Sequence, residues 1–312
     1  MKIAKRIFIF ATVNIAIIAT LSGLLSLLGG HTYLEAKGIN YQSLIIFCLI
    51  WGFGGAFLSL AISRIMAKWM MGVQVLDPHS SNPEHRDLVR RVHGFAKQAG
   101  ISTMPEVGIY EAEELNAFAT GPTKNRALVA VSSGLLHNMN EKELDGVLAH
   151  EVAHIANGDM VTMTLVQGVV NAFVMFLARV IGFFISQFVA EDKRNFVQFG
   201  IVFVLEIVLG VLGMLVVAFV SRAREFRADR GGASLSSTES MIAALERLKA
   251  NYLLPHAEEG PAAVASLKIS GKNNNFVKLF STHPDLSDRI ESLRNLQLRG
   301  RVDFQKASYG YK

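Results

Sequence analysis

Cysteine is almost absent from this sequence: a single residue, Cys48, occurs among 312. One cysteine cannot form a disulfide within the chain, and it cannot supply the clustered thiolates that hold a structural zinc ion. Charged residues are also scarce, at 18% against about 25% in an average soluble domain. The net charge of +5 is not arranged as a basic stripe with interleaved aromatic residues, so nucleic-acid binding is not expected.

The charge is missing from four long apolar runs, and the hydrophobic content of the chain is 51%. Each run is long enough to cross the hydrocarbon core of a membrane as a helix, which takes about 20 residues. Short polar segments separate the first run from the second and the third from the fourth, so we expect two transmembrane hairpins, the second turning within residues 191–195. No small-residue cleavage site follows the first run, so we expect it to be retained rather than removed as a signal peptide. The runs span residues 7–28, 44–62, 161–189 and 196–220.

Basic residues gather just outside the ends of both hairpins. They are Lys2, Lys5, Arg6, Arg64, Lys68, Arg222, Arg224, Arg227 and Arg230. Positive charge accumulates on the cytoplasmic side of a membrane. We therefore expect a multi-pass protein of the cytoplasmic membrane, with both termini and the polar segments that follow each hairpin in the cytoplasm.

Residues 150–154 read His-Glu-Val-Ala-His and match the pattern H-E-x-x-H. Capping signals predict a helix over residues 141–157. Residues four apart share one face of a helix, so His150 and His154 can bind one metal ion. Glu151 lies beside them and can take a proton from a zinc-activated water. The alternative is a helix that carries two unrelated surface histidines.

A catalytic zinc ion needs a third protein ligand and an open fourth position. Glu225 is the best candidate, and Asp229 lies one helical turn further on. One of these acids can bind the metal while the other orients a ligand histidine. In the alternative interpretation, both acids only pair with the four arginines around them. If the two apolar runs between His154 and Glu225 form a hairpin, both sets of ligands return to the same face of the membrane.

Four segments carry a family resemblance. They are His150 to His154, Glu225 with Asp229, Asn116-Ala117-Phe118-Ala119, and Ser281-Thr282-His283-Pro284 followed by Arg289. Together they resemble the HtpX family of bacterial membrane proteases, which are gluzincins related to the CAAX prenyl endopeptidases, and the resemblance covers essentially the whole chain. It implies one Zn²⁺ per chain, cleavage of damaged or misassembled inner-membrane proteins from the cytoplasmic side, and a role in the heat or envelope stress response.

These observations predict a mainly α-helical integral membrane protein. We expect four transmembrane helices in two hairpins, joined to an α+β zincin-like catalytic domain in the cytoplasm. The catalytic domain is divided by the second hairpin, with the zinc-binding helix before it and the third ligand after it. The expected parts are residues 1–68 (first hairpin), 69–160 (catalytic), 161–220 (second hairpin) and 221–312 (catalytic).

Further residues have candidate roles beside the metal. His283 can stabilise the oxyanion of the reaction or occupy the open zinc position, or it is a solvated residue of a turn. Arg289 can fix the loop around His283 through a salt bridge, with Asp229 as one possible partner. The segment from Asn116 to Ala119 resembles the edge strand of the family, which would align an extended substrate by main-chain pairing.

Two charged residues lie inside apolar runs. Arg179 is 13 residues before Asp192 and Glu206 is 14 residues after it, so a hairpin that turns near Asp192 places the two at similar depth. Charges within a membrane are costly and are usually paired. We predict an intramembrane ion pair between Arg179 and Glu206; in the alternative, one of them reaches the membrane surface or faces other protein.

Two other functions remain open at this point. An intramembrane protease would carry H-E-x-x-H on a transmembrane helix, but the helix predicted here is rich in polar residues. A transporter or scaffold that only binds metal would need polar residues along several spans, and few are present beyond Gln167, Asn171, Arg179 and Glu206. The expected partners are the lipid bilayer and membrane-protein substrates, with further copies of the chain or other quality-control proteases as additional candidates.

Overall fold

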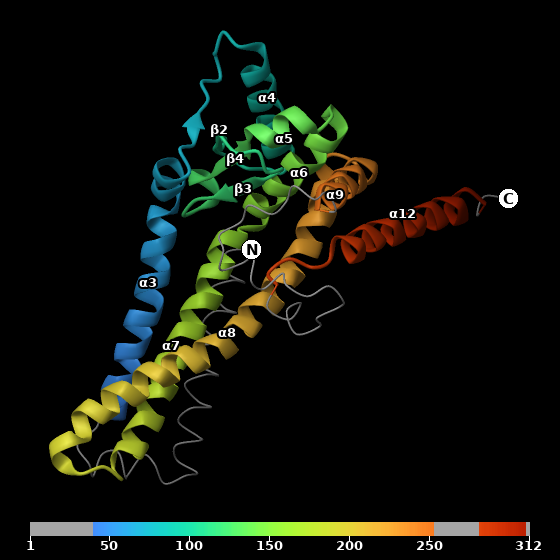
Figure 1. Cartoon of the computed structure of the whole chain (residues 1–312). Coiled ribbons are helices and arrows are strands. Elements are labelled where there is room, and N and C mark those ends of the chain that lie inside the picture. Colours follow the sequence, from blue (N-terminus) through green and yellow to red (C-terminus); the bar gives the residue numbers. More distant parts are fainter. Residues whose placement is uncertain (1–39, 253–280, 310–312) are drawn as a thin grey trace. The chain divides into compact units, whose positions relative to one another are not determined.

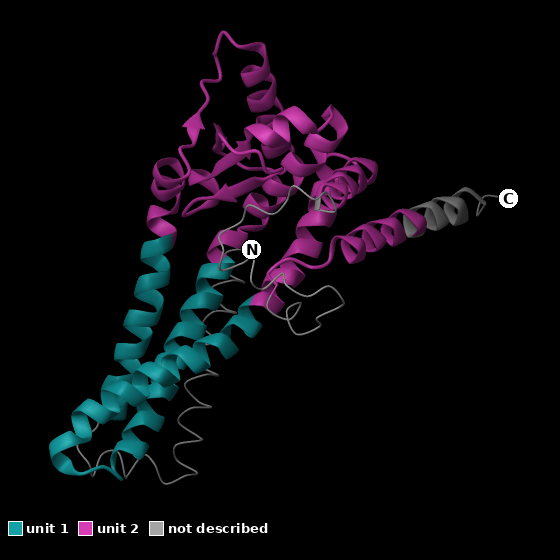
Figure 2. Cartoon of the chain, viewed as in Figure 1, with its two compact units in different colours: residues 1–59, 162–217 teal, residues 60–161, 218–312 magenta. Residues whose placement is uncertain are grey.

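The computed structural model describes residues 40–252 and 281–309. The chain divides into two compact units, each built from two stretches of sequence (Figure 2). Unit 1 comprises Met1–Ser59 and Thr162–Val217, and unit 2 comprises Leu60–Val161 and Ala218–Lys312. The predicted first transmembrane run, residues 7–28, lies outside the described residues.

Unit 1 contains the apolar parts of helices α3 (Tyr41–Met70), α7 (Asp159–Ser186) and α8 (Glu191–Leu235) (Figure 1). These three are the helices of the described residues that are long and apolar enough to cross a membrane. Large apolar side chains are exposed along α8, as is expected for a surface in contact with lipid. They include Phe196, Phe199, Phe203, Ile207, Leu212 and Met214.

Helices α3 and α7 approach each other closely within unit 1. A Cβ atom added to Gly52 of α3 would lie 2.6 Å from the backbone nitrogen of Ala172 in α7. Small residues permit such an approach between membrane helices, where packing rather than water exclusion drives association. The buried side chains of Cys48, Phe176 and Phe183 fill the contact nearby.

Two of these helices are longer than the apolar runs from which they were predicted. Helix α3 continues through polar residues to Met70, and α8 continues to Leu235. The predicted turn at residues 191–195 is wrong, because these residues form the first turns of α8. Glu191 and Asp192 stand at the start of the helix, where negative charge interacts favourably with the helix dipole.

Unit 2 contains a sheet of four strands in the order β1-β2-β4-β3. The strands are β1 (Gln74–Val75), β2 (Glu106–Tyr110), β3 (Ala117–Thr120) and β4 (Leu128–Ser132). Strands β2 and β4 pair in parallel, whereas β1–β2 and β3–β4 are antiparallel. Every residue of β4 is buried, which fits its central place, and β3 forms one edge of the sheet.

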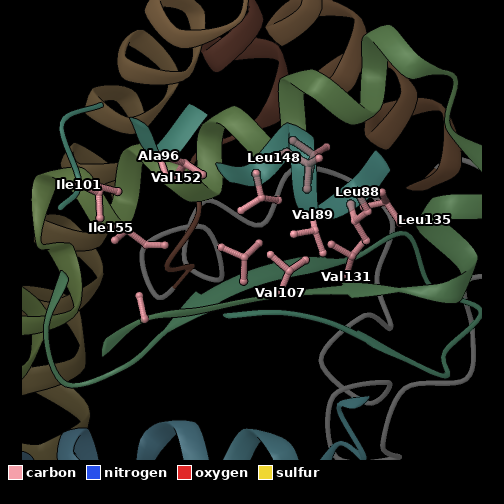
Figure 3. Packing of buried hydrophobic residues seen from close by; sticks show 14 of the residues in the cluster. Leu88, Val89, Ala96, Ile101, Val107, Val131, Leu135, Leu148, Val152 and Ile155 are labelled. Atoms are coloured by element: carbon pink, nitrogen blue, oxygen red, sulfur yellow. The ribbon is translucent and has the colours of Figure 1, made fainter. Parts of the chain in front are cut away.

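The main core of unit 2 lies between this sheet and helices α4 (Pro83–Gln98) and α6 (Glu141–Asn157) (Figure 3). Leu148, Val152 and Ile155 of α6 face Val107 and Val131 of the sheet. Unit 2 also contains the end of α3, the start of α7 and the end of α8. Its other described elements are the short helix α5 (Ser133–Asn138), the 3₁₀ turn η1 (Lys124–Arg126), α9 (Thr238–Tyr252) and α12 (Leu286–Tyr309).

Both ends of α6 follow from local sequence. The side chain of Asn140 accepts from the backbone of Glu143, whose carboxylate accepts from the backbone of Asn140 in return. At the other end Gly158 adopts a left-handed conformation with φ of 66°, which favours glycine. A Cβ atom at Gly146 would overlap the carbonyl oxygen of Ser240, so this glycine lets α6 pack closely against α9. The helix that carries H-E-x-x-H is therefore held on two sides, by the sheet and by α9.

Candidate metal centre

Three side chains of unit 2 converge on one point. His150 and His154 come from α6, and Glu225 comes from the part of α8 that follows its apolar run. The Nε2 atoms of the two histidines are 3.1 Å apart. Each Nε2 lies 3.4 Å from an oxygen of Glu225: His150 from Oε2 and His154 from Oε1. All three side chains are buried, and Glu225 is only 1% exposed.

These separations fit a single zinc ion. Tetrahedral zinc with bonds of about 2.0–2.2 Å to nitrogen and oxygen holds its ligand atoms about 3.3 Å apart. Both Nδ1 atoms contact aspartates, which only accept hydrogen bonds, so each Nε2 can present its lone pair to a metal. Two lone pairs and a carboxylate that face one another inside a protein repel unless a cation lies between them. The residues present therefore fit a His₂Glu zinc site.

His150 is oriented by Asp229, one helical turn after Glu225 on α8. Its Nδ1 is 3.0 Å from Oδ1 of Asp229. Arg289 of α12 holds both oxygens of the same aspartate, with Nε 2.8 Å from Oδ2 and Nη2 2.6 Å from Oδ1. The pairing of Arg289 with Asp229 that the sequence suggested is thus present, and Asp229 contacts His150, a candidate metal ligand.

His154 is oriented by a residue that sequence reasoning missed. Its Nδ1 lies 2.8 Å from Oδ2 of Asp159, the first residue of α7, and Asp159 is completely buried. Arg227 of α8 donates to Oδ1 of the same aspartate. The available signal was an acid that directly follows Gly158, because a left-handed residue turns the chain back toward the last turn of α6.

Glu225 remains ionised in these surroundings. Burial opposes ionisation, but hydrogen bonds from His150, His154 and His283 outweigh burial and hold the pKa of Glu225 far below its usual range. Burial likewise opposes protonation of His150, yet Asp229 and Glu225 raise its pKa to about 9. The site attracts positive charge strongly, so a proton and a metal ion compete for the same nitrogen.

A cavity of about 1050 Å³ adjoins this cluster within unit 2. Glu151 is half-buried in its wall beside His150. Most of the other wall residues are apolar. They include Leu115, Leu135, Val147, Phe219, Phe226, Met241, Leu245 and Leu248. The cavity is therefore wide enough for a peptide segment and offers mainly apolar contacts.

Strand β3 borders the cavity, and within residues 40–252 and 281–309 no further strand pairs with its outer edge. The carbonyl oxygen of Asn116 accepts from the backbone of Ser132, which shows that Asn116 faces β4. Because inward and outward backbone groups alternate along an antiparallel strand, Ala117 and Ala119 present their N–H and C=O groups to the open edge. Asn116 and Ala117 line the cavity, whereas the ring of Phe118 packs against Tyr110 on the other face of the sheet.

His283 lies at the cavity and contacts the carboxylate of Glu225. Its Nδ1 is 3.1 Å from Oε2 of Glu225, while the side chain is 64% exposed. Arg222 donates to the carbonyl oxygen of Ser281, and the hydroxyl of Ser281 donates to the carbonyl oxygen of His283. The loop at residues 281–285 is therefore fastened to α8 and carries His283 to the metal cluster.

The other two predicted residues meet in unit 1. Nη1 of Arg179 is 2.6 Å from Oε1 of Glu206, and it also donates to the carbonyl oxygen of Met175. The guanidinium carbon of Arg179 lies 5.4 Å from the ring centre of Phe47. The structure thus brings together Arg179 on α7 and Glu206 on α8, with an aromatic ring of α3 against the arginine.

Comparison with known proteins agrees with this geometry. Residues 82–297 match the family described as Peptidase family M48. The protease HtpX homolog of Bacillus subtilis is 53% identical over 297 residues, covering 93% of this chain and 99% of that protein. The protease HtpX of Shewanella piezotolerans is 49% identical over 296 residues, with 93% and 99% covered.

The fold also resembles that of a solved structure, Ste24p of S. mikatae. The TM-score is 0.60 at 15% sequence identity, and the match covers 91% of this chain and 66% of that one. At this identity the likeness concerns the fold alone. The two relatives confirm the resemblance to HtpX proteases that the motifs predicted. With apolar helices long enough to span a bilayer, the chain is a membrane metalloprotease that hydrolyses peptide bonds, and it belongs to peptidase family M48.

Proposed function

We propose that this protein is a zinc-dependent endopeptidase of the bacterial cytoplasmic membrane that cleaves misfolded or damaged membrane proteins. The observation that carries the proposal is the convergence of His150, His154 and Glu225 beside Glu151, in a cavity bordered by an open strand edge. H-E-x-x-H lies on α6, which is not among the candidate membrane spans of the described residues. This placement favours cleavage outside the bilayer over intramembrane proteolysis.

Each residue has a separate task in the proposed reaction. His150, His154 and Glu225 would hold the zinc ion, which would supply Lewis acidity that lowers the pKa of a water molecule and polarises a carbonyl group. Glu151 accepts a proton from the attacking water and passes it to the leaving nitrogen. His283, which lies exposed at the cavity, stabilises the negative charge that develops on the carbonyl oxygen.

The open edge of β3 supports the proposed choice of substrate. Outward backbone groups of Ala117 and Ala119 can pair with an extended peptide, as in other cases of strand addition. Folded proteins rarely offer a free extended segment, whereas misfolded ones do. The apolar wall of the cavity suits the side chains of membrane proteins, and attachment to membrane helices keeps the catalytic unit near such substrates. The resemblance to HtpX supports a role in the stress response.

The distribution of basic residues supports a cytoplasmic active site. Arg64 and Lys68 follow the apolar part of α3, and four arginines follow that of α8, in the same part of the helix that carries Glu225. Positive charge of this kind marks the cytoplasmic side.

A substitution of Glu151 tests the proposed mechanism. The purified protein in detergent, given zinc, should cleave an unfolded protein such as casein. Glu151→Gln should lower the rate by about 10²–10⁴-fold, because the amide cannot accept the proton, while the zinc content stays at one ion per chain. Glu141→Gln, an exposed residue on the same helix, serves as the matched control and should cleave normally. Equal cleavage by wild type and Glu151→Gln would exclude Glu151 as the base.

A further inference from the structure

The two proposed metal ligands His150 and His154 have the same kind of partners on the side of the ring away from the metal. The Nδ1 atom of each contacts an aspartate, and an arginine contacts that aspartate in turn. We call these the His150 relay (His150, Asp229, Arg289) and the His154 relay (His154, Asp159, Arg227). The four groups behind the histidines come from three helices, α7, α8 and α12.

We propose that Asp159 and Arg227 are positioning residues for the metal, and that they retain zinc by fixing His154. The inference rests on the proposed zinc site. Oδ2 of Asp159 accepts from His154 and Oδ1 accepts from Arg227, so both oxygens of this buried carboxylate are used. An aspartate behind Nδ1 forces the proton onto that nitrogen and leaves the lone pair on Nε2, where the metal binds.

The His154 relay also connects the helices that carry the ligands. His154 lies in the last turn of α6 and Asp159 begins α7. Gly158 between the two helices turns the chain back so that Asp159 reaches the imidazole. Arg227 is two residues beyond Glu225 on α8. A tie from His154 through Asp159 to Arg227 therefore sets the distance between the two histidines and Glu225.

The two relays differ in exposure, and the difference predicts unequal effects. The Arg289 side chain is 7% exposed and binds Asp229 through two hydrogen bonds, whereas that of Arg227 is 49% exposed and contacts one oxygen of Asp159. Water screens an exposed ion pair. Asp159 should therefore matter more than Arg227, and Arg227 less than Arg289.

The test measures how fast zinc leaves the full-length protein in detergent when a chromogenic chelator is added. Asp159→Asn should release zinc about 10–100-fold faster than wild type, as is typical when a group behind a metal ligand is removed. Arg227→Gln should give a smaller increase in the rate of zinc release. Arg227→Lys keeps the positive charge, so its release rate should lie close to that of wild type. Asp145→Asn is the matched control, since Asp145 lies on α6 and pairs with Arg91 instead; its release rate should equal that of wild type.

Thermal unfolding of the metal-free variants separates positioning from folding. If Asp159 positions His154, Asp159→Asn should strongly reduce the rise in Tm that zinc causes. The Tm of the metal-free protein should fall by a smaller amount. If Asp159→Asn does not fold, the exposed Arg227→Gln carries the same test. Zinc release within twofold of wild type for both Asp159→Asn and Arg227→Gln would overturn the proposal. His154→Ala then separates the two proposals. If this variant loses its zinc, the proposed zinc site is retained and only the role of Asp159 and Arg227 is rejected. If it keeps its zinc, the proposed function is rejected as well.

Discussion

Two of the three glutamates of helix α8 lie in contrasting surroundings. Glu206 lies in unit 1, and its side chain is 36% exposed and paired with Arg179. Glu225 lies in unit 2, is almost fully buried, and contacts His150, His154 and His283 as well as two arginines. Among the described residues, Glu206 has one ionisable partner, whereas Glu225 has five, of which three are histidines and two are arginines.

The contrast indicates how a site differs from a contact between helices. The partners of Glu225 come from α6, α8, the loop at residues 281–285 and α12, so four elements determine the position of one carboxylate. Contacts from four elements leave the Glu225 side chain little freedom to move, which is what a metal site with defined ligand positions requires. The partner of Glu206 comes from one neighbouring helix, which suffices to hold α7 against α8 but not to build a site.

The largest expected difference concerns zinc. Glu225→Gln keeps the shape of the side chain but removes the charge, so zinc affinity should fall by more than the 10–100-fold loss typical of an outer partner. Glu206→Gln should retain one zinc ion per chain. Metal analysis of both purified variants after dialysis measures the effect, and full zinc retention by Glu225→Gln would remove the distinction between the two glutamates.

A second prediction concerns the packing that brings the ligands together. Gly146→Ala should lower the free energy of unfolding by about 1–3 kcal/mol, because the new Cβ would overlap Ser240 and lie 2.8 Å from Cβ of Ala244. Gly94→Ala in α4 is the control: nothing lies within 4 Å of its added Cβ, and the same change should stabilise the protein by about 0.5–1 kcal/mol. Thermal or denaturant unfolding measures both variants. If Gly146→Ala changed the free energy of unfolding by the same amount as Gly94→Ala, the close packing of α6 against α9 would not contribute to stability.

The smallest expected effect concerns the ion pair of unit 1. Arg179→Leu or Glu206→Leu alone should destabilise the protein by about 1 kcal/mol, the range found for polar contacts between membrane helices. The double variant should recover part of this loss, since no charge is then left unpaired. Tm values in detergent complete the double-mutant cycle, and strictly additive losses would contradict a direct interaction.

Local signals predicted the metal helix well. The capping box at Asn140 and the left-handed Gly158 bracket α6 at the residues where the sequence placed its ends. Both signals act within a few residues, so they can be interpreted without knowledge of the fold. Glu225 was predicted differently, from the need of a catalytic zinc ion for a third protein ligand, and the structure places it beside both histidines.

Relations over longer distances were harder to predict. Asp159 lies where the chain leaves unit 2 at the start of α7, and Arg227 lies where the chain has returned to it in α8. No periodic pattern marks either residue. Strand β1 has two residues, too few for an alternating pattern, and the parallel pairing of β2 with β4 depends on the whole sheet. Helices α3 and α8 extend beyond their apolar runs. Hydropathy indicates which residues can lie in a membrane, but it does not indicate where a helix ends.

We expect His150, His154 and Glu225 to hold one metal ion. Crystals of the zinc-loaded protein, measured at the zinc absorption edge, test it most directly. We predict a single anomalous peak per chain, about 2.0–2.2 Å from Nε2 of both histidines and from an oxygen of Glu225. A zinc peak elsewhere, or a peak at the two histidines with Glu225 turned away from it, would contradict this assignment of the ligands.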